Sequence, residues 1–181
     1  MVEGDRSVLA SKASDLPQQW KAVTPPDGWT GRHTLLPGLV DAHCHGGAGG
    51  EFGADAASAA LASGHHHRSG TTSLLGSLVS NTHESLISGV ATCAALVAQD
   101  DLAGIHLEGP FLSMERRGAQ NPLALCDVDV GLVEALAEAV AAAGAPGALA
   151  QMPFARTVRR CRPSRAAGLL RRPGPHAPPR V

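Results

Sequence analysis

The sequence predicts an α/β protein whose strands lie parallel in one sheet, and three observations support this class. Strand-like and helix-like segments alternate from residue 34 to residue 152 in the order β-α-β-α-β-α-β, which requires parallel strands joined by right-handed crossovers. The helical segments carry apolar residues at helical spacing. Histidine and glutamate side chains stand where strands end, and the carboxyl ends of strands are where parallel α/β proteins keep their chemistry.

Residues 1–33 precede this alternation and carry no sustained periodicity. Val2 to Val8 is expected to form a strand end and a turn, and residues 11–32 are polar and punctuated by Pro and Gly. We interpret residues 1–33 as the remnant of a small β domain. The first ten residues are too polar for a signal peptide, and no apolar run approaches the roughly 18 residues of a membrane span. The prediction is a cytoplasmic protein without a membrane partner.

The first strong strand signal ends in a His-x-His pair. An apolar segment from Leu35 runs into His43 and His45 and then into glycines. Residues two apart on a strand share a face, so both imidazoles can converge on one ion. Neighbouring histidines are also common on surface strands, but the apolar lead and the glycines favour metal ligation here.

A helix and a second strand follow. Asp55 to Arg68 is rich in alanine and predicts a helix that Gly70 ends. Its last turn holds three adjacent histidines, at positions 65–67. Consecutive helical positions fan out by about 100°, so these imidazoles are not expected to share one ion, whereas cationic side chains suit a helix C-terminus. Thr71 to Ser80 predicts the second strand.

Two further helices are expected, each with one apolar stripe. Asn81 or Thr82 caps the first, and Asp127 or Asp129 starts the second, which Gly144 ends. The predicted stripes are Leu86, Val90, Cys93 and Val97 in the first helix, and Val133, Leu136 and Val140 in the second. Residues 148–152 begin a fourth strand.

The third strand, Gly104 to Glu108, ends in a carboxylate. Alternation places His106 and Glu108 on the same face of the strand. Gly109 and Pro110 stop the strand, so Glu108 lies at its carboxyl end, on the rim that also carries the His-x-His pair. A carboxylate at that place needs a cation. A metal ion and an arginine of the next loop, Arg116 or Arg117, both remain open as its partner.

Length and composition limit what this chain can be. With 181 residues it is short for a closed (β/α)₈ barrel, which takes about 250. Residues 153–181 hold eight arginines, six of the 13 prolines and no acidic residue, and their charge of +8 opposes −9 in the rest of the chain. The four cysteines are widely separated without a Cys-x-x-Cys pair, so we expect reduced thiols and no cysteine-based zinc site.

Several blocks of sequence resemble one enzyme family. Pro37 to Gly46, which contains His-Cys-His, is similar to the first-strand signature of the amidohydrolase superfamily. The blocks Gly70-Thr-Thr-Ser, Ile105-His-Leu-Glu-Gly-Pro-Phe and Arg117-Gly-Ala-Gln-Asn-Pro narrow the resemblance to N-acetylglucosamine-6-phosphate deacetylases. The similarity runs from about Val2 to Met152.

The resemblance implies a fold and an activity. Family members carry a metal-bearing (β/α)₈ TIM barrel beside a small β-sandwich. Residues 34–152 would then be the N-terminal half of the barrel, about four βα units, and residues 1–33 a remnant of the sandwich. The family converts N-acetylglucosamine 6-phosphate to glucosamine 6-phosphate and acetate, in amino-sugar catabolism. The implied partner is this amino sugar phosphate, and a homo-oligomer is expected only of a full-length chain.

The resemblance also implies roles for individual residues. Glu108 is implied as a metal ligand, and His43 and His45 as ligands of a second or alternative metal position. Zn²⁺ is the favoured ion, with Fe²⁺, Co²⁺ or Mn²⁺ as alternatives; such an ion polarises an amide carbonyl and activates water at neutral pH. Ala119 and Gln120 fall where the family contacts the sugar, although the family usually has histidine in place of Gln120.

Other family residues have no counterpart here. The family takes two more histidine ligands and a catalytic Asp from later strands, but after Glu108 this sequence has only His176, and no acidic residue follows Glu138. No catalytic residue is therefore assigned, and the chain is expected to be inactive. We interpret residues 153–181 as an out-of-frame or disordered end. The alternatives are a non-catalytic half-barrel fragment and a nucleic-acid-binding protein with a basic tail, which the scarcity of aromatic residues there disfavours.

Overall fold

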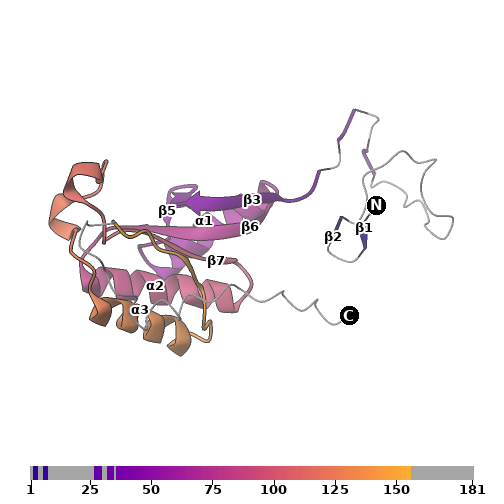
Figure 1. The fold of residues 1–181 in the computed structure, drawn as a ribbon. Helices are drawn as coiled ribbons and strands as arrows, with labels where there is room; N and C mark the ends of the chain where they lie inside the picture. Colours follow the sequence, from indigo (N-terminus) through magenta and orange to yellow (C-terminus); the bar gives the residue numbers. More distant parts are fainter. Residues whose placement is uncertain (1, 4–5, 8–26, 30–31, 35, 156–181) are drawn as a thin grey trace. The chain divides into compact units, whose positions relative to one another are not determined.

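The structure, a computed structural model, describes residues 2–3, 6–7, 27–29, 32–34 and 36–155 (Figure 1). The chain divides into two compact units, residues 1–37 with 175–181, and residues 38–174. In the first unit, strand β1 (Val2–Glu3) pairs antiparallel with β2 (Arg6–Ser7), which agrees with the predicted strand end and turn. The interpretation of residues 1–33 as a sandwich remnant stays a prediction.

The second unit is built on one parallel sheet of four strands. These are β3 (Leu39–Cys44), β6 (Thr71–Val79), β7 (Gly104–Glu108) and β8 (Leu149–Gln151), hydrogen-bonded in that order. Helices α1 (Ala56–Arg68), α2 (His83–Ala98) and α3 (Val130–Ala142) connect them. Right-handed crossovers between neighbouring parallel strands place all three helices on one face. The predicted α/β class with a parallel sheet is confirmed; closure into a barrel stays a prediction.

The helices begin and end at residues suited to those positions. Asp55 caps α1, Thr82 caps α2 and Asp129 caps α3, each by accepting hydrogen bonds from backbone N–H groups of the first turn. Of the paired candidates, Thr82 and Asp129 are therefore the caps. Gly70 and Gly144 follow α1 and α3 with φ of 98° and 80°, the left-handed conformation that glycine adopts without strain.

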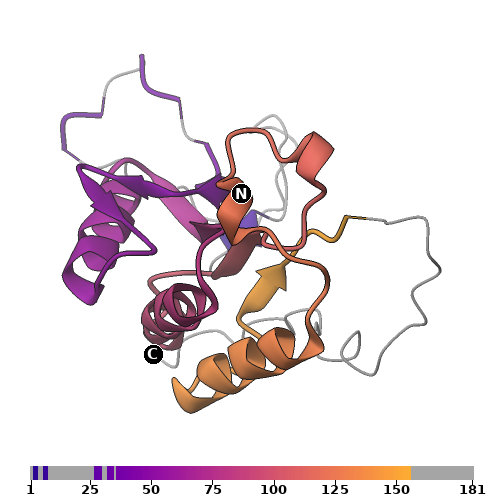
Figure 2. The ribbon, with the colours of Figure 1, turned by 90° about the vertical axis from the view of Figure 1, so that its left-hand side faces the viewer.

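The core lies between the sheet and the helices. Ile105 and Leu107 of β7 are fully buried, and Leu74 and Leu78 of β6 lie beside them. Figures 1 and 2 show α2 and α3 side by side against the sheet. Their buried residues include Leu86, Val90, Cys93 and Leu96 in α2, and Leu132, Leu136 and Val140 in α3. The predicted stripe members Val97 and Val133 pack against this core but are only partly buried. Their neighbours Leu96 and Leu132, which the predicted stripes omitted, are buried instead.

A small glycine hairpin between β3 and α1 was not predicted. It consists of β4 (Gly46–Gly47) and β5 (Gly50–Glu51). Glycine has no intrinsic preference for strands, so composition gives no signal for this element. The hairpin touches α1 closely, because Glu51 N donates to Ser58 Oγ over 2.8 Å and a Cβ on Gly50 would collide with the Ser58 carbonyl oxygen. The first sheet strand also begins later than predicted, at Leu39.

Two short 3₁₀ turns, η2 (Met114–Arg116) and η3 (Pro122–Ala124), lie in the loop between β7 and α3. Beyond β8 the described chain continues to Ala155, where the Phe154 ring stacks on Phe111 with centroids 5.5 Å apart. Most of the predicted tail, with Cys161 and His176, lies outside the described residues. Within the part of the chain that is described, no helix is both long and apolar enough to cross a membrane.

Candidate metal centre

The three predicted ligands come together at the carboxyl ends of two strands. His43 lies in β3, His45 directly follows it, and Glu108 is the last residue of β7. The His43 and His45 Nε2 atoms lie 3.0 Å apart, and Glu108 Oε2 lies 3.1 Å from His45 Nε2 and 3.6 Å from His43 Nε2. Because β6 separates β3 from β7, these side chains converge across the end of β6. The expected convergence of the two imidazoles is therefore observed.

A hydrogen bond fixes which nitrogen of His45 is available. Its Nδ1 lies 3.1 Å from the Ser77 carbonyl oxygen, which can only accept, so Nδ1 carries a proton. In the neutral ring, Nε2 then presents its lone pair to Glu108. Two electron-rich atoms 3.1 Å apart repel each other unless a proton or a metal ion lies between them. The Ser77 carbonyl oxygen therefore fixes the orientation of the His45 ring and directs its Nε2 toward Glu108.

Ser77 of β6 also organises the neighbouring side chains. Its Oγ accepts the Cys44 N–H over 3.0 Å and lies 3.0 Å from His106 Nδ1. The His106 ring stands edge-on to that of His43, with centroids 4.7 Å apart. Burial, reinforced by His43, lowers the pKa of His106, so its imidazole is neutral near pH 7. Sequence reasoning placed His106 on the correct face but gave it no role, because its partner comes from another strand.

The arginine alternative for Glu108 finds no support in the loop after β7. Within the described residues, the basic side chains within 4 Å of the Glu108 carboxylate are those of His43 and His45. Arg117 Nη1 instead donates to the carbonyl oxygens of Gln120, over 2.7 Å, and Gly118, over 3.4 Å. Arg116 is exposed in η2. In the part of the chain that the structure describes, neither arginine of this loop is thus seen paired with Glu108, and a metal ion as its partner stays a prediction.

The predicted sugar-contact residues lie close to the same strand ends. Gln120 is buried, and its Oε1 accepts the Ser80 N–H over 2.8 Å. Ser80 Oγ in turn donates to the Glu108 carbonyl oxygen over 3.1 Å. Ala119 is exposed beside this linked group. Gln120 thus connects the loop after β7 to the end of β6. Ser80 is the one residue that links Gln120 to the backbone of Glu108.

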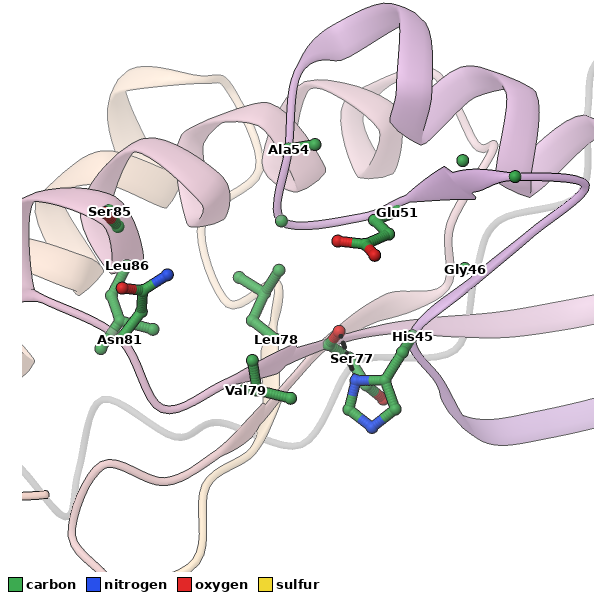
Figure 3. Close-up of a pocket in the computed structure, with 13 residues that line it drawn as sticks. His45, Gly46, Glu51, Ala54, Ser77, Leu78, Val79, Asn81, Ser85 and Leu86 are labelled. Atoms are coloured by element: carbon green, nitrogen blue, oxygen red, sulfur yellow. Dashed lines mark hydrogen bonds between the residues drawn. The ribbon is translucent and has the colours of Figure 1, made fainter. Parts of the chain in front are cut away.

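A pocket of about 500 Å³ adjoins His45 on the side of the hairpin. Figure 3 shows His45 and Ser77 at one end and Asn81 and Ser85, at the start of α2, at the other, with Glu51 of β5 above. Leu78 and Leu86 supply an apolar wall. The polar groups at both ends and the apolar wall are features of small-molecule sites.

The three histidines that close α1 point to different partners. His67 donates from Nδ1 to the Thr71 carbonyl over 2.9 Å and from Nε2 to the Asp101 carbonyl over 2.8 Å. Both hydrogen bonds raise the pKa of His67, and the bond to the Asp101 carbonyl contributes more than the bond to the Thr71 carbonyl. His65 is exposed, whereas His66 Nε2 lies 3.1 Å from Cys44 Sγ. The prediction that the three share no ion agrees with this arrangement.

The described cysteines, Cys44, Cys93 and Cys126, are free thiols as predicted. Burial raises the pKa of Cys93 to about 12 and also raises the pKa of Cys44. Cys93 belongs to α2 and is buried in the hydrophobic core. Cys44 lies next to His66, and Asp41 completes a second group of potential ligands there. Sequence reasoning missed this group because its members come from β3 and the far end of α1.

Comparisons with known proteins point to one enzyme. Over 130 residues, 65% of this chain, the sequence is 31% identical to the N-acetylglucosamine-6-phosphate deacetylase of Bacillus subtilis (strain 168), and covers 31% of it. Over 95 residues, 48% of this chain, it is 33% identical to the enzyme of the same name from Lysinibacillus sphaericus, and covers 24% of it. No protein-family model matches.

Solved structures give the same result. The crystal structure of N-acetyl-D-glucosamine-6-phosphate deacetylase from Mycobacterium smegmatis matches with a TM-score of 0.56 and 38% identity, covering 62% of this chain and 31% of that one. A mutant of that enzyme in complex with N-acetyl-D-glucosamine-6-phosphate matches with a TM-score of 0.57 and 38% identity, over 64% and 29% of the two chains. The chain thus resembles these deacetylases, as the motifs predicted, and spans about a third or less of their length.

Proposed function

We propose that residues 34–152 are the N-terminal half of an N-acetylglucosamine-6-phosphate deacetylase barrel and that His43, His45 and Glu108 bind its divalent metal ion. The observation that carries this proposal is the meeting of His43, His45 and Glu108 at the ends of β3 and β7. The similarity to deacetylases of three organisms supports it. In this proposal the four parallel strands are consecutive barrel strands, and residues 1–33 belong to the small β-sandwich.

The donor atoms suit such an ion. Two imidazole nitrogens and one carboxylate oxygen are the ligand set of several catalytic zinc sites, which leave a position open for substrate or water. When bound, a divalent ion supplies the Lewis acidity that makes an amide carbonyl electrophilic and water nucleophilic at neutral pH. Among the alternatives, Fe²⁺, Co²⁺ and Mn²⁺ also accept imidazole or carboxylate ligands.

The chain's own residues orient and hold this site. Ser77 fixes the ring of His45 through its carbonyl oxygen, and Ser80 holds the backbone of Glu108. His106, neutral near pH 7, packs against His43 without adding a charge. Each ligand is therefore positioned by a neighbour on β6 or β7, although the side chains of His43 and His45 stay 53% and 42% exposed.

Metal binding is tested by dialysing the purified chain against buffered Zn²⁺ and measuring bound zinc. Glu108→Ala is expected to lower the zinc content by one equivalent, whereas the matched control Glu115→Ala, an exposed glutamate in η2, leaves it unchanged. Equal zinc content in the Glu108→Ala and unaltered chains would remove Glu108 from the site. We expect weak binding, because three protein ligands alone hold the ion.

Substrate contact can be located by NMR. We propose that Ala119 and Gln120 contact the amino sugar phosphate, and the pocket beside His45 offers a competing location. Titration with glucosamine 6-phosphate is expected to shift the amide signals of Ala119 and Gln120. Shifts confined to Asn81 and Ser85 would instead place the sugar in the pocket and overturn the assignment of the two loop residues.

The 181-residue chain on its own is proposed to lack appreciable deacetylase activity. It has no acidic residue after Glu138 to serve as the later catalytic Asp, and loss of such a proton-transfer group typically costs about 10²–10⁴ in rate. Acetate release from N-acetylglucosamine 6-phosphate measures this, with the Mycobacterium smegmatis enzyme as the positive control. Robust turnover by the chain would show that residues 153–181 supply the missing groups.

The proposed frame change has a direct test. If residues 153–181 are read out of frame, the coding DNA beyond the Met152 codon should contain, in another frame, a strand motif with the missing histidines. Sequencing across that codon decides between a frame change and a natural arginine-rich tail. A coding region with no such alternative frame would contradict the proposal.

A further inference from the structure

We infer that Asp41, Cys44 and His66 form a second metal site, for Zn²⁺ or a similar thiolate-binding ion, separate from the site of His43, His45 and Glu108. One donor atom of each residue lies within 4.8 Å of the other two. Thiolate, imidazole and carboxylate are the three protein donors that zinc takes most often. This inference goes beyond the proposed deacetylase function, which does not use these residues, and it reverses the expectation from cysteine spacing that no cysteine takes part in a zinc site.

The distances around Cys44 are slightly shorter than the edges of a tetrahedral metal site. Cys44 Sγ lies 3.1 Å from His66 Nε2 and 3.4 Å from the Gly46 carbonyl oxygen. His66 Nε2 lies 3.1 Å from the same oxygen. A tetrahedron with metal–ligand bonds of about 2.0–2.3 Å has edges of roughly 3.3–3.8 Å. Small movements of these atoms would therefore admit an ion, with Asp41 or the Gly46 carbonyl as a further ligand.

An irregularity of β3 brings Asp41 and Cys44 together. Asp41 pairs with Leu74 of β6, but Cys44 pairs with Gly76, so three steps along β3 match two along β6. Such a bulge re-aims a side chain that regular alternation would send elsewhere. The result is that a carboxylate and a thiol three residues apart reach the same imidazole.

The glycine hairpin leaves room for that imidazole. His66 comes from the last turn of α1, and a Cβ built on Gly47 would lie 2.8 Å from His66 Nε2. A residue with a side chain at position 47 would push the ring away from Cys44. The absence of a side chain at Gly47 of the hairpin therefore allows the His66 ring to approach Cys44.

The two sites lie on opposite sides of β3. Cys44 alternates with His43 and His45 along the chain, so its side chain faces the helix layer, where it is 7% exposed. The His43 and His45 side chains are 53% and 42% exposed. The backbone joins the sites, because Asp41 Oδ1 accepts the His43 N–H over 3.1 Å. The second carboxylate oxygen of Asp41 is a candidate ligand that leaves this bond intact.

Co²⁺ binding provides a direct test, because a cobalt–thiolate bond gives a charge-transfer band in the near ultraviolet that nitrogen and oxygen ligands do not give. The full chain carrying Glu108→Ala, which disables the first site, is titrated with Co²⁺. We expect the thiolate band, and its loss when Cys44→Ser is added. The matched control Cys126→Ser should keep the band. Absence of the band, or its survival in Cys44→Ser, would overturn the proposal.

Thiol protection tests the unaltered chain and does not depend on the folding of variants. Alkylation of Cys44 and Cys126 is followed by mass spectrometry with and without Zn²⁺. At a zinc concentration ten times the dissociation constant, Cys44 should react about tenfold more slowly, with Cys126 unchanged. Equal Cys44 rates in both conditions would contradict the site. Because Glu108 takes no part in this readout, its outcome is separate from that of the deacetylase proposal.

Discussion

Strands β7 and β3 lead to the two halves of the cluster of Glu108, His43 and His45, but the two strands lie in contrasting environments. In β7 the four residues before Glu108 are buried, so the core fixes the position of the carboxylate. In β3, Leu39 and Val40 are 55% and 76% exposed, and in the described sheet β3 pairs with β6 alone. His43 and His45 are instead held by hydrogen bonds to Asp41 and Ser77. One half of the site thus depends on packing and the other on polar contacts.

The largest expected effect separates the two strands by core packing. Leu107→Ala in β7 removes a fully buried side chain and should lower the free energy of unfolding by about 2–5 kcal/mol. Val40→Ala in β3, at a position 76% exposed, should change it by less than about 0.5 kcal/mol. Urea unfolding followed by circular dichroism measures both. Similar losses in the two variants would refute the contrast between the strands.

A substitution at Gly109, directly after β7, should have the next largest effect on stability and on zinc affinity. Gly109 has a φ of 114°, and a Cβ there would collide with Ser80 Oγ, which holds the backbone of Glu108. Gly109→Ala should cost about 1–3 kcal/mol in backbone strain and also weaken zinc binding. Gly144→Ala is the control, because its φ is 80° and nothing lies within 4 Å of its added Cβ. Equal effects of the two substitutions on zinc affinity would disprove the role of Ser80.

A hydroxyl group on β6 should matter for the edge strand. Ser77→Ala leaves the buried Cys44 N–H without its acceptor, at a cost of about 1–3 kcal/mol. Ser73→Ala lies on the same strand, and within the described residues the Ser73 hydroxyl makes no hydrogen bond to another side chain or to the backbone, so this change should stay within about 0.5 kcal/mol. Thermal unfolding of the two variants provides the comparison. A loss in Ser73→Ala as large as in Ser77→Ala would show that the bond to Cys44 contributes nothing specific.

The substitution with the smallest expected effect on stability, Val40→Lys, should instead change the association between copies of the chain. Val40→Lys places a charge on the exposed side of β3, and charged residues on edge strands oppose pairing between molecules. We expect unchanged unfolding and less self-association in sedimentation velocity. Unchanged association would show that this edge is not a contact between copies of the chain.

Much of the sheet and its helices follows from local sequence. The bounds of β7 match the prediction because Gly109 and Pro110 end the strand whatever surrounds it, and Asp55 and Gly70 mark the ends of α1 in the same way. The triad of His43, His45 and Glu108 followed from strand alternation together with the rule that parallel strands share one rim. The element bounds depend on residues within a few positions of one another, whereas the meeting of His43 and His45 with Glu108 depends on the order of the parallel strands in the sheet.

The features that could not be predicted depend on tertiary contacts. Cys44 lies opposite His66 because β3 contains a bulge and because Gly47 leaves space, and neither fact can be read from local propensity. The motif that contains Gln120 predicted a sugar-contact position. It did not predict the buried hydrogen bond of Gln120, whose donor, Ser80, follows β6 and lies forty residues earlier in the sequence. The hairpin of β4 and β5 consists mainly of glycine, which gives no strand signal.

The hydroxyl group and the backbone carbonyl group of Ser77 together have a consequence for amide hydrogen exchange. Its hydroxyl protects the Cys44 amide, while its carbonyl oxygen holds the ring of His45. For the Cys44 amide to exchange with solvent, β3 must separate locally from β6, and that opening also disturbs the orientation of His45. An ion held by His45 therefore opposes the opening, and exchange at Cys44 slows as the ion binds more tightly. A single backbone amide can thus report occupancy of the neighbouring site.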